Sequence, residues 1–446
     1  MPSTSLTYRT ALRLAASLAP AAGLLSPRLR QGIEARRDAG ARLLAWARSH
    51  RDQGRPLAWF HAASAGEGLQ AEAVLRELRR RSPSCQMVYT HFSPSAAGLA
   101  ARIAADVADY LPYDTASNVD QLLDALKPDL LVFAKLDLWP ELSTRASTHG
   151  ADVAIVAGTV SPGSSRLRWP ARMILQPGYR VVAAAAAVSP EDAARLVTLG
   201  VDPERIRVLG DPRFDSVVEK VAGMRAQDPL LRFGRGAPTL VAGSTWPEDE
   251  EVLLRAYAGI RSVYPSARLI LVPHEPAEHH LKRIERAAVG AGVPPPVRLS
   301  AAVDATALLL IDRLGVLAGL YGAGTMAYVG GGFGRAGLHS VLEPAAWSLP
   351  VTFGPRWTNS RDAALLLDGG GGTALPPGTK AAITALEKLW SDWIRDDAGR
   401  MEQGRNARQV VERGRGASES SAEMLLQLIS SRFPRMSLNA ERSGRR

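Results

Sequence analysis

The glycine-rich segment between residues 326 and 344 holds the residue types best suited to binding an anion. A short apolar run leads into seven candidate ligand-binding residues: Gly330, Gly331, Gly332, Gly337, His339, Ser340 and Glu343. Glycines let backbone N–H groups approach a phosphate closely, and the positive end of a following helix favours negative charge. Because Glu343 lies four residues beyond His339, both are expected on one helix face, where the carboxylate can accept hydrogen bonds from ribose hydroxyls.

This glycine pattern has a second interpretation. Glycines also stand between a strand and a helix wherever the chain must turn tightly. No Gly-Lys-Ser or Gly-Lys-Thr follows them, so the segment does not have the pattern of a Walker P-loop. The residues therefore favour a phosphate cradle and leave a structural turn as the alternative.

A carboxylate follows the apolar run that forms the first predicted strand. That run ends near residue 62 and leads through Ser64 and Gly66 to Glu67, at the expected start of a helix. N–H donors at a helix start keep a carboxylate ionised, which suits a general base that takes a proton from an attacking hydroxyl. An acid in the first turn is also a common stabilising feature, so both interpretations stay open.

Other polar residues follow predicted strands, where wound sheets bind ligands. Lys135 can contact a phosphate and Asp137 can orient a hydroxyl, although Asp137 equally fits a helix N-cap. In the second half of the chain, Ser244 and Thr245 can hold a phosphate or cap a helix, and His274 can donate to a phosphate or a base. These residues complete the set of candidate site residues.

Short apolar strands alternate with polar-faced helices over most of the chain. The predicted strands cover 57–62, 86–92, 107–111, 130–134, 152–157, 183–188, 206–209, 239–242, 268–272, 307–311, 326–329 and 350–353. Strands that alternate with helices predict parallel sheets covered on both faces. The fold class is therefore α/β.

A polar, proline- and glycine-containing stretch near residues 216–238 interrupts this alternation and marks a domain boundary. The expected organisation is an N-terminal segment (1–50), two doubly wound domains (51–222 and 223–434) and a disordered basic tail (435–446). The helical stretch before that tail closes the second domain or returns to the first. Ligands are expected in a cleft between the domains, at the carboxyl ends of the strands.

The composition and net charge of the chain favour some classes of binding partner over others. The chain has 446 residues and a formal net charge of +10, which favours anionic partners. Nucleic acid is not expected among them, because basic and aromatic residues do not interleave and no zinc-finger spacing is present. The single cysteine, Cys85, excludes internal disulfides, and the neighbouring His279 and His280 lack further ligands at zinc spacing.

The N-terminal stretch over residues 6–25 is apolar but contains Arg9, Arg13 and Pro20, and several arginines follow it. It is too short and too interrupted to predict a membrane-spanning helix. Apolar residues flanked by arginines instead predict an anchor on the surface of an anionic membrane. A soluble helix that caps the first domain is the alternative.

Several ordered motifs resemble the Kdo transferases of lipopolysaccharide biosynthesis, which are GT-B glycosyltransferases that use CMP-Kdo. They are Trp59–Glu67, Phe92–Ser95, Tyr110–Asp114, Gly210–Asp215, Ala242–Thr245 and the glycine-rich run that ends at Ala345. The resemblance implies two Rossmann-like doubly wound domains with an inter-domain cleft. It also implies an N-terminal membrane-associated helix and a location on the cytoplasmic face of the inner membrane.

The resemblance further implies that Glu67 is the catalytic base for inverting transfer of Kdo from CMP-Kdo to a lipid A precursor. No metal or other cofactor is expected in that step. The second domain should hold CMP, with 330–332 and His339 near phosphate and Glu343 near ribose. The chain departs from the family pattern at 135–138, 157–161, 274–276 and Ser340, which leaves open the acceptor and a rival interpretation as a nucleotide-sugar-binding protein without catalysis.

Overall fold

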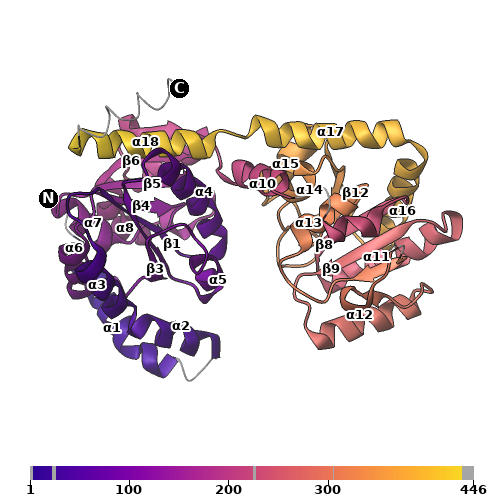
Figure 1. Cartoon of the computed structure of the whole chain (residues 1–446), viewed down its shortest axis with the longest axis horizontal. Helices are drawn as coiled ribbons and strands as arrows, with labels where there is room; N and C mark the ends of the chain where they lie inside the picture. Colours follow the sequence, from indigo (N-terminus) through magenta and orange to yellow (C-terminus); the bar gives the residue numbers. More distant parts are fainter. Residues whose placement is uncertain (1–3, 23–26, 225–227, 305, 434–446) are drawn as a thin grey trace. The chain divides into compact units, whose positions relative to one another are not determined.

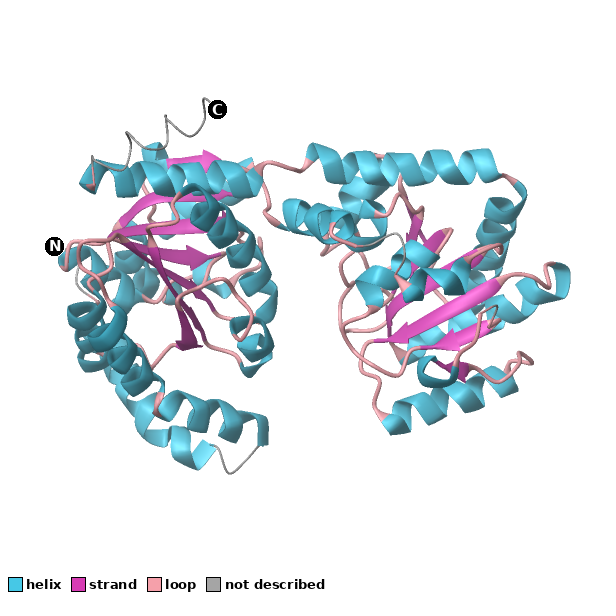
Figure 2. Ribbon diagram, viewed as in Figure 1, coloured by secondary structure: helices cyan, strands magenta, loops and turns pink. Residues whose placement is uncertain are grey.

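The computed structural model describes residues 4–22, 27–224, 228–304 and 306–433 (Figure 1). These residues form two compact units. The first contains the described residues up to Ser216 together with those from Arg415 onward, and the second runs from Val217 to Gly414. Figure 2 shows helices packed around the sheet of each unit.

The first unit is built on a seven-stranded parallel sheet in the order β3-β2-β1-β4-β5-β6-β7. Its strands are β1 (Leu57–Ala62), β2 (Gln86–His91), β3 (Val107–Tyr110), β4 (Leu130–Ala134), β5 (Asp152–Gly158), β6 (Val182–Ala187) and β7 (Ile206–Val208). The strand order reverses between β1 and β4. In wound α/β sheets, ligands bind at the carboxyl ends of the strands beside such a switch point.

Because successive side chains along a strand point to opposite faces, the sheet has an apolar core on each side. In β1, Leu57 and Trp59 join one core cluster, whereas Ala58 and Phe60 join the other. The first face is covered by α3 (Ala39–His50), α6 (Ala116–Leu126), α7 (Pro140–Thr148), α8 (Ala171–Arg180) and α9 (Pro190–Leu199). The second face is covered by α4 (Ala65–Arg81) and α18 (Ala417–Arg432).

The second unit repeats the design with a parallel sheet in the order β10-β11-β9-β8-β12-β13-β14. Its strands are β8 (Thr239–Thr245), β9 (Arg268–Pro273), β10 (Val297–Arg298), β11 (Leu308–Leu310), β12 (Met326–Val329), β13 (Val351–Phe353) and β14 (Gly372–Ala374). Its helices include α11 (Pro247–Val263), α12 (Glu278–Gly290), α14 (Leu342–Ala346), α15 (Arg361–Asp368), α16 (Thr379–Arg395) and α17 (Asp397–Arg413). The switch point here lies between β8 and β12.

The α/β class and the predicted strands are confirmed. Two strands, β10 and β14, were not predicted, because they have only two and three residues and carry too little pattern to detect. The basic tail beyond residue 433 lies outside the described residues.

The predicted domain limits are wrong in three places. Helix α18 belongs to the first unit, because its apolar residues Leu425 and Ile429 pack into the same cluster as α4 (Figure 1). The Asp215 carboxylate also accepts the backbone N–H groups of Gly416 and Ser418, at 2.7 and 2.8 Å. The boundary between the units falls inside α10 (Arg213–Ala222) rather than after residue 222.

The third correction concerns the N-terminal segment, which is not separate from the first unit. Helix α3 buries Leu43 and Ala47 in that unit's core. Before it come α1 (Leu6–Ala22) and α2 (Pro27–Arg37). Within the described residues, the structure contains no helix with the length and apolar character that crossing a bilayer requires.

Candidate active site

The switch point of the first sheet brings two groups of predicted site residues together. Ser64, Gly66 and Glu67 follow β1, and Lys135 and Asp137 follow β4, the strand paired with β1. The Lys135 Nζ atom lies 3.8 Å from Glu67 Oε1. These residues, which the sequence placed after two separate strands, therefore share one edge of the sheet, and we call Glu67, Lys135 and Asp137 the carboxylate cluster.

Glu67 lies in the first turn of α4, where its Oε2 accepts the backbone N–H of Ser64 at 3.1 Å. Its side chain is 13% exposed. Burial raises the pKa of Glu67, the negative charge of Asp137 raises it further, and Lys135 and the Ser64 hydrogen bonds lower it. The N–H donors at the helix start do favour the ionised form, as expected, but desolvation outweighs them and the net shift of the pKa is upward. A raised carboxyl pKa brings a general base closer to neutral pH.

Lys135 has a φ of +62°, in the left-handed region that non-glycine residues rarely occupy. Backbone strain of this kind often marks functional sites. Asp137 is not an N-cap, because α7 begins later, at Pro140. It instead pairs with Arg166, whose guanidinium also donates to the Leu136 carbonyl at 2.8 Å. Sequence analysis missed Arg166, which lies in a three-residue 3-10 helix (Ser165–Leu167), because so short an element has no detectable pattern.

Aromatic side chains fix the loop that carries Lys135 and Asp137. Trp139 Nε1 donates to His61 Nε2 at 3.0 Å, and His61 is fully buried in β1. Burial lowers the pKa of His61 to about 3, so the ring is neutral and can accept this bond. Gly66, by contrast, is exposed and has open space where a side chain would stand.

The second switch point brings Ser244 and Thr245, at the end of β8, beside the glycines that follow β12. The N–H of Gly330 donates to the Gly243 carbonyl, and the N–H of Gly331 donates to Asp249 Oδ2, both at 2.9 Å. Neither N–H is therefore available to a phosphate. This part of the phosphate-cradle prediction is wrong, and the alternative of a tight turn is correct for these two groups.

Close backbone contact explains why glycines occupy this turn. A side chain on Gly330 would place its Cβ 2.3 Å from the Ser244 oxygen, and one on Gly332 would lie 2.7 Å from the Gly354 nitrogen. Gly331 has a φ of +93°, and its Cβ would lie 2.1 Å from the Gly337 oxygen. The turn thus requires glycine at all three positions.

His339 and Glu343 do not share a helix face. The helix α14 begins only at Leu342 and has five residues, so His339 precedes it in irregular structure. The N–H of His339 closes the glycine turn on the Gly330 carbonyl at 3.2 Å. Glu343 accepts from Lys220 Nζ at 2.9 Å. The glycine turn therefore includes His339, which was expected to lie in the first turn of a helix. Ser340, which follows His339, is exposed.

Two predicted histidines do come together in the second unit. The His274 and His339 rings lie 4.5 Å apart, and both contact the indole of Trp246, which donates to His339 Nε2 at 3.1 Å. Burial, and then His274, lower the pKa of His339 to about 4. The neutral ring accepts at Nε2, so its proton is on Nδ1. We call Trp246, His274 and His339 the ring cluster.

A cavity of about 210 Å³ adjoins the ring cluster and is lined by Trp246, His274 and Arg283 among others. Thr245 does not contribute to it, because its buried hydroxyl donates to Glu250 Oε1 at 3.2 Å. Ser244 is partly exposed and has a φ of +52°. Sequence analysis missed Trp246, although its place directly after Thr245 could have suggested it.

Glu250 holds two of the polar side chains that line this cavity. It contacts His280 Nε2 at 2.8 Å and Arg283 at 2.9 Å. His280 thus has a structural partner. Among the residues that the structure describes, no cluster of His, Cys, Asp or Glu side chains has the makings of a metal site.

Comparison with known proteins finds a family match over the part of the chain that holds the carboxylate cluster. Residues 37–216 match the family model of 3-deoxy-D-manno-octulosonic-acid (Kdo) transferases. The Kdo transferase of Haemophilus influenzae is 25% identical over 385 residues, which cover 82% of this chain and 86% of that protein. The chain is a relative of the Kdo transferases. A second relative, the Kdo transferase of Aquifex aeolicus, is 27% identical over 75% of this chain and 86% of its own length.

Solved structures place the chain among GT-B folds. UDP-GlcNAc 2-epimerase from Neisseria meningitidis superposes with a TM-score of 0.61 at 14% identity, over 83% of this chain and 100% of that one. A glycosyltransferase from Rickettsia africae gives 0.54 at 10% identity, over 84% and 99%. The predicted GT-B class is confirmed. Within the first unit, the family match contains the whole carboxylate cluster.

Proposed function

We propose that this chain is a glycosyltransferase of lipopolysaccharide assembly that moves Kdo from CMP-Kdo to a lipid A precursor with inversion. One observation carries the proposal. Glu67, with a raised pKa, lies beside Lys135 at the switch point of a parallel sheet, within the segment that matches the Kdo transferase family. Kinship with Kdo transferases over most of the chain supports the choice of sugar.

In this proposal Glu67 is the general base. The acceptor hydroxyl gives its proton to the Glu67 carboxylate while its oxygen forms a bond to the anomeric carbon of Kdo. The bond from that carbon to the phosphate oxygen breaks, and CMP leaves with the electron pair. Attack on the face opposite CMP inverts the anomeric centre. Lys135 supports the ionised form of Glu67, and Asp137 opposes it.

The ring cluster of the second unit is the proposed donor site. Its stacked rings offer flat apolar faces to a nucleotide base, and the Nδ1–H of neutral His339 can donate to an acceptor oxygen. Ser244 and Gly332 are retained as candidate phosphate contacts, and Gly332 also shapes the turn through its close approach to Gly354. Gly330, Gly331 and Thr245 are retained only as residues that shape the turn.

We also propose that the protein lies on the cytoplasmic face of the inner membrane through α1. That helix exposes three large apolar side chains, Leu6, Leu14 and Leu18, which are 79, 57 and 63% exposed. Tyr8 and Arg9, near its start, hold it to the first unit through hydrogen bonds to buried carboxylates. A docked helix with an outward apolar stripe suits an interfacial anchor.

Membrane fractionation tests the anchor. Replacement of both Leu14 and Leu18 by Glu should move the protein from the membrane pellet to the supernatant. Val263 is 67% exposed in the second unit, so Val263→Glu is a control that should change nothing. A double variant that sediments like the unaltered chain would show that the attachment lies elsewhere.

The decisive experiment for the function is mass spectrometry of the product formed from CMP-Kdo and a tetraacylated lipid A precursor. We expect a mass increase of one or more Kdo units. The alternative is a nucleotide-sugar-binding protein without catalysis, which the departures at Lys135 and its neighbours favour. Binding of CMP-Kdo without transfer to any lipid A precursor would establish that alternative.

A further inference from the structure

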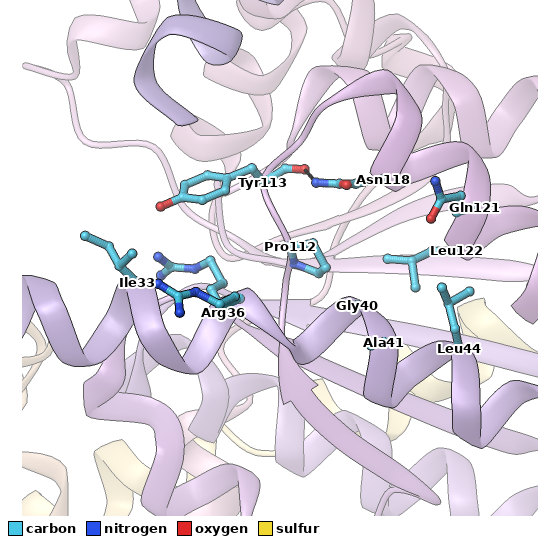
Figure 3. A pocket seen from close by; sticks show the side chains of 11 residues that line it. Ile33, Arg36, Gly40, Ala41, Leu44, Pro112, Tyr113, Asn118, Gln121 and Leu122 are labelled. Atoms are coloured by element: carbon cyan, nitrogen blue, oxygen red, sulfur yellow. Dashed lines mark hydrogen bonds between the residues drawn. The ribbon is translucent and has the colours of Figure 1, made fainter. Parts of the chain in front are cut away.

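A second cavity lies within the first unit, with a volume of about 400 Å³ (Figure 3). It is lined by α2, α3, α6 and the segment that connects β3 to α6. None of the residues of the carboxylate cluster lines it. Its size is in the range of small-ligand sites, and the proposed transfer reaction gives it no role.

A buried cation stands at one end of this cavity. Arg36 is only 8% exposed, and its Nε has no hydrogen-bond partner. The guanidinium donates to the Phe92 carbonyl, and its carbon lies 3.8 Å from the centre of the Phe92 ring and 5.6 Å from that of Tyr113. Among the described residues, no carboxylate forms an ion pair with it. A buried charge without a counter-ion is costly, so an anionic ligand would stabilise this arrangement.

The remaining walls divide by chemistry. Arg37, the exposed neighbour of Arg36, also lines the cavity and adds a second guanidinium. Leu44 and Leu122 lie at the end of the row of lining residues away from Arg36 (Figure 3). Gln121 lies beside these two leucines, and Ile33 lies beside Arg36 (Figure 3). The cavity therefore has a cationic end and an end that is apolar apart from Gln121, which is the polarity of a small amphiphile.

We propose that this cavity binds a phosphate-bearing amphiphile, with its phosphate on Arg36 and Arg37 and its apolar part against Leu44 and Leu122. Guanidinium groups match phosphate oxygens in pairs, and two of them can hold one phosphate. The ligand is defined by this chemistry and can be a membrane lipid or a soluble phosphate ester. The proposal goes beyond the transfer reaction and does not depend on it.

Titration calorimetry on the full-length protein tests the site. The probes are dihexanoyl phosphatidic acid, dihexanoyl phosphatidylcholine and inorganic phosphate. We expect the phosphatidic acid to bind at least tenfold more tightly than the other two. Equal binding of inorganic phosphate would overturn the apolar half of the proposal, and equal binding of phosphatidylcholine would overturn the anionic half.

Variants separate this cavity from the general positive charge of the protein. Gly40 lines the cavity, and a Cβ there would meet only the Pro112 ring, at 3.5 Å. Gly40→Leu therefore fills the cavity without changing any charge and should weaken the phosphatidic acid at least tenfold. Arg37→Gln should also weaken it, whereas Arg48→Gln, an exposed position on the same helix α3 as Gly40 but outside the cavity, should not.

Two results with these variants would contradict the proposed site. Unchanged binding in Gly40→Leu, or equal weakening in Arg37→Gln and Arg48→Gln, would refute it. Arg37 is exposed, so its variant is expected to fold even if the filled cavity destabilises the unit. Co-sedimentation with phosphatidic acid vesicles, measured in the Leu14→Glu, Leu18→Glu background that removes the proposed α1 anchor, then identifies the source. A loss in Gly40→Leu supports a membrane lipid, and unchanged sedimentation with lost soluble binding supports a soluble ester.

Discussion

Replacement of Glu67 by Gln removes the proposed base while keeping the shape of the side chain. The amide oxygen can still accept the Ser64 N–H, so the start of α4 should be unaffected. Among the residues that the structure describes, the ion pair that this change removes is the 3.8 Å contact with Lys135, whose side chain is 42% exposed. Partly exposed pairs of this kind contribute about 0–1 kcal/mol.

The stability change has a predictable sign. Because the folded-state pKa of Glu67 is raised, the stability that its carboxyl group contributes is present at low pH and is lost as the pH rises through that pKa. At neutral pH the ionised group therefore destabilises the fold relative to a neutral isostere. We expect the Gln variant to have a melting temperature equal to or higher than that of the unaltered protein.

Activity should change in the opposite sense. A positioned general base contributes a factor of about 10² to 10⁴, or roughly 2.7–5.4 kcal/mol in the activation barrier. The assay is single-turnover transfer of radiolabelled Kdo to a lipid A precursor. Glu72→Gln in the same helix, at a position without an assigned role, is the matched control. A Glu67 variant that retains more than a third of the unaltered rate, with Glu72→Gln also unaffected, would refute the assignment of the base.

Two further predictions use the same structural reasoning. The fall of kcat/KM at low pH follows protonation of Glu67. Lys135→Met should therefore move this acid limb of the pH profile to higher pH, and Asp137→Asn should move it to lower pH. Acid limbs that move in the same direction in both variants would contradict the electrostatic account. Gly331→Ala should destabilise the second unit by about 2 kcal/mol or more in urea unfolding, because of its positive φ and the backbone clash. Gly66→Ala, which meets open space, should change stability by less than about 0.5 kcal/mol, and similar losses in both would refute the packing argument.

Local patterns were sufficient to predict the strands and the edge of the sheet on which the carboxylate cluster lies. In β1 and β4 every residue is buried, and continuous apolar runs of this kind predict strands of a parallel sheet without tertiary information. Since polar residues follow each run, Glu67 and Lys135 had to emerge at carboxyl ends. The adjacency of β1 and β4 was not visible in the sequence, because strand order depends on pairing between distant segments.

The glycine turn shows where sequence reasoning was insufficient. The residues around Gly331 favoured a phosphate cradle over a tight turn, and only the position of Asp249 decides which partner its N–H meets. In the same way, the sequence could not show that α18 returns to the first unit, since its apolar residues suit either core. The sequence by itself determined the fold class and the longer strands, because these follow from the order of neighbouring residues, whereas Glu67 became the candidate base only through the family resemblance. The tertiary structure alone decided the hydrogen-bond partners, the pKa direction of Glu67 and the buried cation at Arg36, because burial and pairing depend on residues distant in the chain.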